Sequence, residues 1–342
     1  MTDTLILPDD PVALARELAE RHMGDGLPVV PATAERVIAM LAQSPRAADE
    51  TIGWMPPTWG QVTPRYVAIN AVLAGCVPEH FPVLLAAVEA MLEPDFNLYG
   101  IQATTNPVAP LLVVHGPIAR RLGINAKAGA FGPGTYANAV IGRAVRFVLM
   151  NIGGAIPGET DRATQGQAAK YTFCVAENEE DSPWAPFHVR RGLAAEDDAV
   201  SVFGIQAEHN IIDLTAENGT ELLTVLARAM AAVGTNNMTH GGEALLVISP
   251  EHAELLQQTG FDPESTGHFL YEHARIDALA LPPRLEKLLR ERRPLWADFS
   301  RLPITDGPED VQLLVVGGTG IHALFMPSFG ATRAITRRIV GR

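Results

Sequence analysis

Two cysteines and the acidic residues near them are the first candidates for chemistry in this sequence. Cys76 lies in Ala-Gly-Cys-Val-Pro-Glu-His, between two predicted helices, where the positive end of a helix dipole would lower the pKa of a thiol. Glu79 and His80 follow closely and suit acid–base catalysis. Because cysteine is also among the most buried residue types, Cys76 has a structural interpretation as well.

A second group surrounds Cys174, in the run Lys-Tyr-Thr-Phe-Cys-Val-Ala-Glu at 170–177. A strand is predicted here, with Lys170 at its start and Glu177 at its end, and alternation places Cys174 and Ala176 on one face. A carboxylate at the end of a buried strand suits a catalytic base or a cation ligand. The acidic run that continues to residue 181 is equally typical of a solvated loop.

A glycine-rich stretch at 129–134 leads into a predicted helix and is the best candidate for binding an anion. Gly132 and Gly134 allow close approach of the backbone, and the helix that follows directs free N–H groups toward a ligand. Asn138 and Arg143 lie on that helix. The stretch matches neither dinucleotide nor P-loop patterns, and a glycine turn entering a core helix is the structural alternative.

Other polar side chains lie next to similar apolar runs. Leu-Leu-Val-Val at 111–114, Leu-Leu-Val-Ile at 245–248 and Leu-Leu-Val-Val at 313–316 are preceded or followed by polar turns. These turns supply Asn106, Asn237 and Thr319 as candidate substrate-binding residues. His115, His240 and His322 lie beside the same runs and are weak metal candidates, because they converge only if the repetition is structural. We therefore predict no cofactor and leave a metal ion as an alternative.

Short apolar strands alternating with helices predict an α/β fold whose strands are buried on both faces. Helices are expected from Pro11, from Thr33 to about 42, from Thr63 to 75, from Pro82 and over 136–150, 221–233 and three segments of 251–292. Strands are expected at 98–104, 111–114, 171–175, 199–203, 244–248 and 312–316, and residues 44–62 are expected to form an ordered loop.

The repeated runs predict an internal duplication. We expect N-terminal helices and a loop over 1–62, followed by one α/β unit over 63–342 with repeats at about 63–125 and 215–260 and a third echo at 310–330. Chance recurrence of apolar strands is the alternative. The segments around residues 76, 106, 132, 174 and 237 are then expected to meet at one hollow.

Composition narrows the class of protein. The 342 residues are 47% hydrophobic and 19% charged, with a net charge of −13, which indicates a globular protein and argues against a nucleic-acid partner. No secretory signal and no membrane segment is predicted, and two cysteines 98 positions apart suggest free thiols. A cytoplasmic protein with a small-molecule substrate is expected, and a homo-oligomer is compatible with the composition.

Seven stretches together resemble an uncharacterised bacterial family often grouped with the UGSC-motif (seleno)proteins. They are DGLPVVPAT (25–33), AINAVLAGCVPEHFP (68–82), QATTNPVAP (102–110), FGPG (131–134), NIGGAIPG (151–158), KYTFCVAENEEDSPW (170–184) and MPSFGATR (326–333). The resemblance spans nearly the whole chain and implies one integrated enzyme-like unit, with attention to Cys76 and Cys174. No Cys-Gly-Ser-Cys stretch is present, so a redox centre of that kind is not implied.

These observations favour an enzyme acting on a small polar or anionic metabolite, by hydrolase or lyase chemistry assisted by a thiol or a carboxylate. The candidate catalytic residues are Cys76, Glu79, Lys170, Cys174 and Glu177. A thiol- or selenol-dependent oxidoreductase, or its partner subunit, is the first alternative. A non-catalytic ligand-binding or assembly subunit is the second.

Overall fold

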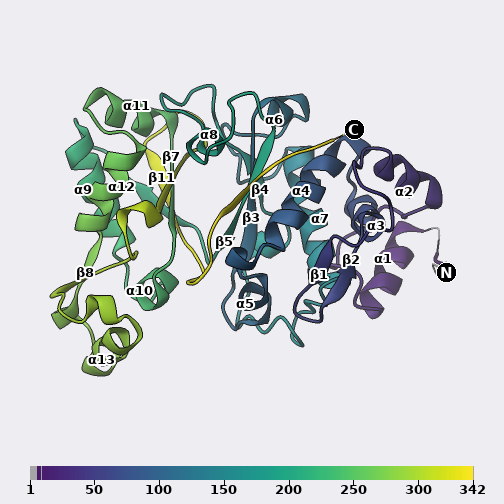
Figure 1. Cartoon of the computed structure of the whole chain (residues 1–342), viewed down its shortest axis with the longest axis horizontal. Helices are drawn as coiled ribbons and strands as arrows, with labels where there is room; N and C mark the ends of the chain where they lie inside the picture. The colour runs from purple at the N-terminus through teal and green to yellow at the C-terminus, as the bar shows by residue number, and fades with distance from the viewer. Residues whose placement is uncertain (1–5, 9, 342) are drawn as a thin grey trace.

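Two four-stranded mixed sheets lie face to face at the centre of the computed structural model, which describes residues 6–8 and 10–341. The first sheet has the order β12 (Ile335–Arg338), β5 (Ala199–Ile205), β3 (Ala109–His115) and β4 (Cys174–Ala176). The second has the order β6 (His209–Ile212), β11 (His322–Pro327), β7 (Ala244–Ile248) and β10 (Val311–Val315). Helices cover the outer face of each sheet, which gives four layers (Figure 1). The predicted α/β class is confirmed.

Strand alternation explains why both faces of each sheet are apolar. In β3, Leu111 and Val113 point into the core between the sheets, whereas Leu112 and Val114 pack under the helices. In β7, Leu245 and Val247 face the first sheet. The uninterrupted apolar runs seen in the sequence are therefore strands buried on both sides.

The two sheets have the same internal arrangement. β3 and β7 each pair in parallel with one neighbour, β4 or β10, and antiparallel with another, β5 or β11. The fourth strand of each sheet comes from the other half of the chain, because β6 follows β5 but pairs with β11, and β12 follows β11 but pairs with β5. The third apolar run, at 313–316, lies mainly in β10, which is the parallel neighbour of β7. In the first sheet the equivalent strand is β4, the parallel neighbour of β3, and not β3 itself. A duplication in ancestry stays a prediction.

The helices match in the same way. α4 (Phe81–Met91) precedes β3, while α6 (Pro117–Arg121) and α7 (Tyr136–Asn151) follow it. α9 (Gly219–Met230) precedes β7, while α11 (Pro250–Gln258) and α12 (Pro263–His273) follow it. α7 packs closely on β4, since a Cβ atom at Gly142 would collide with Thr172 and the backbone of Phe173. Gly142 therefore serves packing rather than a ligand.

The N-terminal region shares the hydrophobic core between the first sheet and the helices that cover it. α1 (Pro11–Glu20) and α2 (Ala34–Leu41) contribute Leu14, Leu18 and Met40 to the same cluster as α3 (Pro64–Ala74), α4 and α7. The described residues among the first 62, which are 6–8 and 10–62, thus have no separate hydrophobic core. The sequence's first five residues, part of the segment judged to lack a secretory signal, lie outside the described residues.

Two local expectations were wrong outright, and the strand expected at 171–175 begins only at Cys174, after a short 3-10 turn that ends at Lys170. Residues 98–104, expected as a strand, form α5 (Leu98–Ala103), because Asn97 takes a left-handed conformation and its side chain accepts a hydrogen bond from the N–H of Gly100. The expected loop at 44–62 contains a hairpin of β1 (Gly53–Met55) and β2 (Gly60–Val62). The remaining elements are α8 (Phe187–Arg190), α10 (Asn236–His240), α13 (Pro283–Arg292), β8 (Arg275–Asp277) and β9 (Arg301–Pro303).

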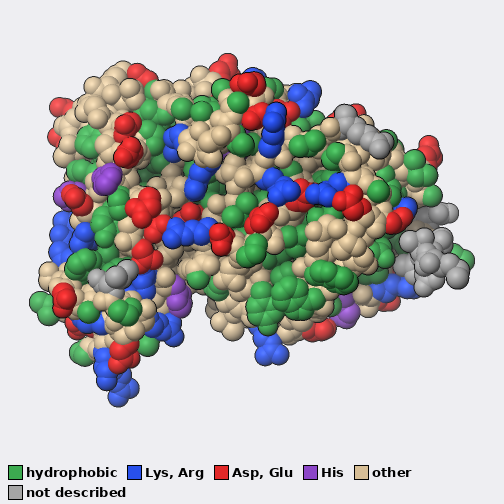
Figure 2. All heavy atoms as spheres, viewed as in Figure 1, with side chains coloured by type: hydrophobic (Ala, Val, Ile, Leu, Met, Phe, Trp, Pro, Cys, Tyr) green, Lys and Arg blue, Asp and Glu red, His purple; other side chains and the backbone are tan. Residues whose placement is uncertain are grey.

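Within the described ranges, none of the helices has both the length and the apolar character needed to cross a membrane. Acidic and basic side chains are interspersed over the face in Figure 2, and α13 lies on the protrusion at its lower left.

Candidate functional site

The best candidate site is a cavity of about 650 Å³ between α7, the chain that follows α1, and the loop 156–171. Its wall carries Asp25, Arg146, Asp161 and Lys170, together with Gln167. This size suits a small metabolite. A polar lining that converges from three segments distinguishes this cavity from a gap in packing.

Three of its charged side chains form one hydrogen-bonded network. Lys170 Nζ donates to both carboxylate oxygens of Asp161 at 2.7 and 2.8 Å, and Arg146 Nη2 donates to Asp161 Oδ2 at 3.1 Å. The side chains are largely buried, with 4% of Asp161 and 14% of Lys170 exposed. Such charge-assisted bonds in a poorly hydrated place are stronger than surface ion pairs.

Burial sets the pKa values of these three hydrogen-bonded side chains. It lowers the pKa of Lys170, against the opposing effect of Asp161, and it also lowers the pKa of Arg146. For Asp161, burial acts to raise the pKa, but the hydrogen bonds from Lys170 and the two neighbouring cations outweigh it, so the pKa is lowered. Asp161 therefore stays ionised, while Lys170 gives up its proton more readily than a solvated lysine.

Local structure fixes the position of each group. Arg146 projects from the middle of α7, and Lys170 ends a short 3-10 turn just before β4. The loop that carries Asp161 is tied back on itself, because the N–H of Gly158 donates to the Asp161 carbonyl at 2.9 Å. Gln167 Nε2 donates to the carbonyls of Pro107 and Ile205, which anchors the loop to the first sheet.

Arg143, a candidate for substrate binding, supports the cavity wall instead of pointing into free space. Its Nε and Nη2 donate to the two oxygens of Asp25 at 2.6 and 2.8 Å, and Nη2 also donates to the carbonyl of Leu27. This bidentate pair holds the chain around Asp25 against α7.

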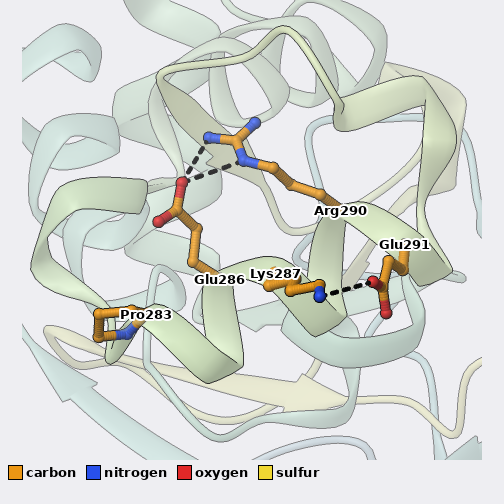
Figure 3. A pocket seen from close by; sticks show the side chains of 5 residues that line it. All are labelled: Pro283, Glu286, Lys287, Arg290 and Glu291. Carbon is orange, nitrogen blue, oxygen red and sulfur yellow. Dashed lines mark hydrogen bonds and ion pairs between the residues drawn. The ribbon is translucent and has the colours of Figure 1, made fainter.

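A second hollow, on α13, lacks these features (Figure 3). It is lined by residues of one helix, where Glu286 pairs with Arg290 and Lys287 with Glu291 one turn apart. Pairs of this kind on a helix surface are common and contribute little. We do not consider this hollow a site.

Glu177 and His115, two of the predicted residues, do meet, but at the opposite end of β4 from Lys170. His115 Nδ1 lies 2.8 Å from Glu177 Oε2, and His115 Nε2 lies 2.8 Å from Ser201 Oγ. Glu179, which is half-buried, and His188, which is buried, complete a group in which the four ligand atoms lie within 4.8 Å of one another. His240 and His322 are exposed and lie outside this group, so the three predicted histidines do not converge.

Both thiols lie in the hydrophobic core between the first sheet and the helices that cover it. Cys76 follows α3 and contacts the carbonyl of Val140 through Sγ at 3.4 Å, and Cys174 is the first residue of β4. Burial raises the pKa of Cys174 to about 12, and burial together with Cys174 raises the pKa of Cys76 further. A neutral, enclosed thiol is a poor nucleophile. Glu79, the expected partner of Cys76, is exposed.

The predicted amide residues hold the backbone in place. Asn138 bonds the backbone of Asn125 and Ala130, and buried Asn237 donates to the carbonyls of residues 241–243. Asn106 donates to Asn236 at 3.1 Å, which joins the first and second echoes. Gly132, Gly134 and Thr319 lie in exposed loops.

The expectation of one shared hollow was therefore wrong. Segments 76 and 174 share a core, segments 106 and 237 meet at a second place, and 132 is exposed. Sequence reasoning did not nominate Asp161, Gln167 or His188. Asp161 lies in an irregular loop nine residues before Lys170, and nothing in that spacing signals a contact.

Comparisons with protein-family models and with curated proteins give no match to this chain. The resemblance to the family grouped with the UGSC-motif proteins thus stays a prediction.

Proposed function

We propose that this chain is an enzyme that binds a small anionic metabolite in the cavity beside α7 and exchanges a proton with it through Lys170. The observation that carries the proposal is the buried chain formed by Arg146, Asp161 and Lys170 on the cavity wall. Connected, partly desolvated ionisable groups with lowered lysine pKa are typical of catalytic sites.

Charge favours an anionic ligand. Arg146 and Lys170 carry two positive charges, and Asp161 carries one negative charge. The negative charge of Asp25 is compensated by Arg143. The cavity wall therefore has an excess positive charge in a place where water screens it weakly. A carboxylate or phosphate group would compensate it.

The chemistry follows from the lowered pKa of Lys170. Lys170 is charged when it attracts the anion, and its lowered pKa makes release of that proton easier. The amine formed in this way can take a proton from a carbon next to a carboxylate, as a lyase requires, or from water, as a hydrolase requires. Asp161 positions the amine and accepts its hydrogen bonds, and Arg146 is suited to hold the anionic group. The proposal therefore keeps the hydrolase or lyase hypothesis with assistance by a carboxylate, here that of Asp161, and drops assistance by a thiol.

The buried thiols count against the thiol or selenol oxidoreductase, because neither Cys76 nor Cys174 lines the cavity and both have raised pKa values. A ligand-binding subunit without turnover would use the same positive charge and is the competing function. A cytoplasmic location and a homo-oligomer remain predictions from the sequence.

The test uses a panel of small carboxylates and phosphate esters, screened by thermal shift and then for turnover by product analysis. Lys170→Met is expected to abolish turnover, and Arg146→Met to abolish binding. Lys127→Met is the matched control, because Lys127 pairs with Glu180 and Asp181 at the surface and does not line the cavity.

Ligand binding that survives in both cavity variants would contradict the proposed site. Binding that is lost in Arg146→Met without turnover in the wild type would favour the ligand-binding subunit. Circular dichroism of each variant separates these results from misfolding.

A further inference from the structure

Four side chains of metal-binding type meet at the carboxyl ends of β3 and β4, away from the cavity. They are His115, Glu177, Glu179 and His188, which we term the carboxylate–histidine cluster. We infer that this cluster binds one divalent transition-metal ion of the zinc type, through two imidazole nitrogens and two carboxylate oxygens. The inference goes beyond the proposed function and is independent of it.

The fold brings the four residues together from three segments. His115 is the last residue of β3, and Glu177 and Glu179 follow its parallel neighbour β4. His188 belongs to α8, and its ring lies 5.4 Å from that of His115. Parallel strands end at the same edge of a sheet, where α/β proteins commonly place ligands.

His188 supplies the first argument. Its side chain is 0% exposed, and no hydrogen bond of ordinary geometry reaches either ring nitrogen among the described residues; the backbone of Ala194 makes only a weaker contact. Glu179 Oε1 lies 3.6 Å from Nδ1, which is beyond a hydrogen bond. A buried polar group without a partner costs free energy, and a metal ion would complete the coordination of this one.

Charge supplies the second argument. Glu177 and Glu179 are both withdrawn from solvent and accept hydrogen bonds from backbone N–H groups. The nearby guanidinium of Arg190 donates to backbone carbonyls rather than to either carboxylate. Buried carboxylates are normally paired with a cation, and a divalent ion would compensate two of them at once.

The surroundings of His115 supply the third argument. Without an ion, His115 Nδ1–H donates to Glu177 Oε2 at 2.8 Å and Nε2 accepts from Ser201 Oγ; a bound ion would select the other tautomer, in which Nε2–H donates to Ser201 and the Nδ1 lone pair faces the ion. Ser201 Oγ in turn lies 2.8 Å from Thr336 Oγ1. Metal-binding histidines commonly donate their second N–H to such an outer partner. Ligands of a tetrahedral zinc ion are about 3.3 Å apart, so the Nδ1–Oε2 pair would open by about half an ångström.

The experiment measures metal content in the full-length protein. Protein is expressed in media supplemented with zinc, iron or manganese, purified without chelator and analysed by mass spectrometry of the elements. Glu179→Gln and His188→Ala remove ligands, and His252→Ala is the matched control, a buried histidine outside the cluster whose Nδ1 also lacks a partner.

We expect about one ion per chain in the wild type and in His252→Ala, and less than about a fifth of that in the two ligand variants. Metal below that level in wild-type protein from all three media would overturn the inference. Equal metal in wild type and both ligand variants would also overturn it, because the ion would then be bound elsewhere.

A second measurement covers the case in which the ligand variants fail to fold. Wild-type protein is unfolded with a chelator and refolded with or without zinc chloride or cobalt chloride. Zinc is expected to raise the thermal unfolding midpoint, and cobalt is expected to give the visible absorption of a tetrahedral site. Absence of both effects would show that the cluster is only a hydrogen-bond network.

Discussion

Replacing Asp161 by asparagine is expected to lower the free energy of unfolding by about 3 kcal/mol at pH 7. Asparagine has nearly the same shape but no charge, so Lys170 and Arg146 would be left as two buried cations without a counterion. Removing one partner of a buried pair costs roughly 3–5 kcal/mol, and the low end applies because 14% of Lys170 reaches the cavity.

The sign of the pH dependence follows from the lowered pKa of Asp161. Its contribution is present above the pKa of the unfolded carboxyl, about 3.9, and is lost as pH falls through the folded value. At pH 7 the full effect is therefore expected. The measurement is urea unfolding, followed by fluorescence of the four tryptophans.

A double-mutant cycle identifies the partner. Lys170→Met in the Asp161→Asn background removes an uncompensated cation, so the double variant is expected to recover about 1–2 kcal/mol of the loss. Asp49→Asn, at the solvent-exposed pair with Arg65, is the control and is expected to leave stability unchanged. A loss below about 0.5 kcal/mol for Asp161→Asn, or strictly additive effects, would refute the reasoning.

Three further outcomes are expected. Neither Cys76 nor Cys174 should react with an aromatic disulfide reagent in the native protein, whereas both should react in denaturant; rapid native labelling would show that one thiol is accessible. Burial lowers the pKa of His252, so below about pH 6.5 the unfolded chain binds more protons than the folded one, and the free energy of unfolding decreases as the pH is lowered. His252→Asn should flatten this pH dependence in urea titrations, and an unchanged slope would contradict the prediction. Asn237→Ala should cost about 2 kcal/mol in thermal unfolding, because buried carbonyls and the N–H of Ser328 lose their partner; a neutral result would mean that the loop at 241–243 rearranges.

Local patterns in the sequence predicted much of the fold. Thr33 and Thr63 do cap helices, and the strand at 244–248 has the predicted ends. The helix expected over 136–150 extends one residue further. These features depend on neighbours a few positions away, so they can be read from periodicity and capping residues. α5 was missed because its start depends on the left-handed conformation of Asn97, which the apolar run after it does not reveal.

The site depended on contacts that no local pattern encodes. The sequence nominated Lys170, Glu177 and His115 by their positions beside strands. Only the parallel pairing of β3 with β4 brought Glu177 to His115, and only the loop that returns under α7 brought Asp161 to Lys170.

The sequence by itself determined most of the helices and strands and which of their faces are apolar, because those properties follow from residue types at fixed spacing. The tertiary structure decided that each half lends its last strand to the other sheet, and that Cys76 and Cys174 are enclosed in the core. It decided these points because burial and charge pairing are properties of residues far apart in the chain.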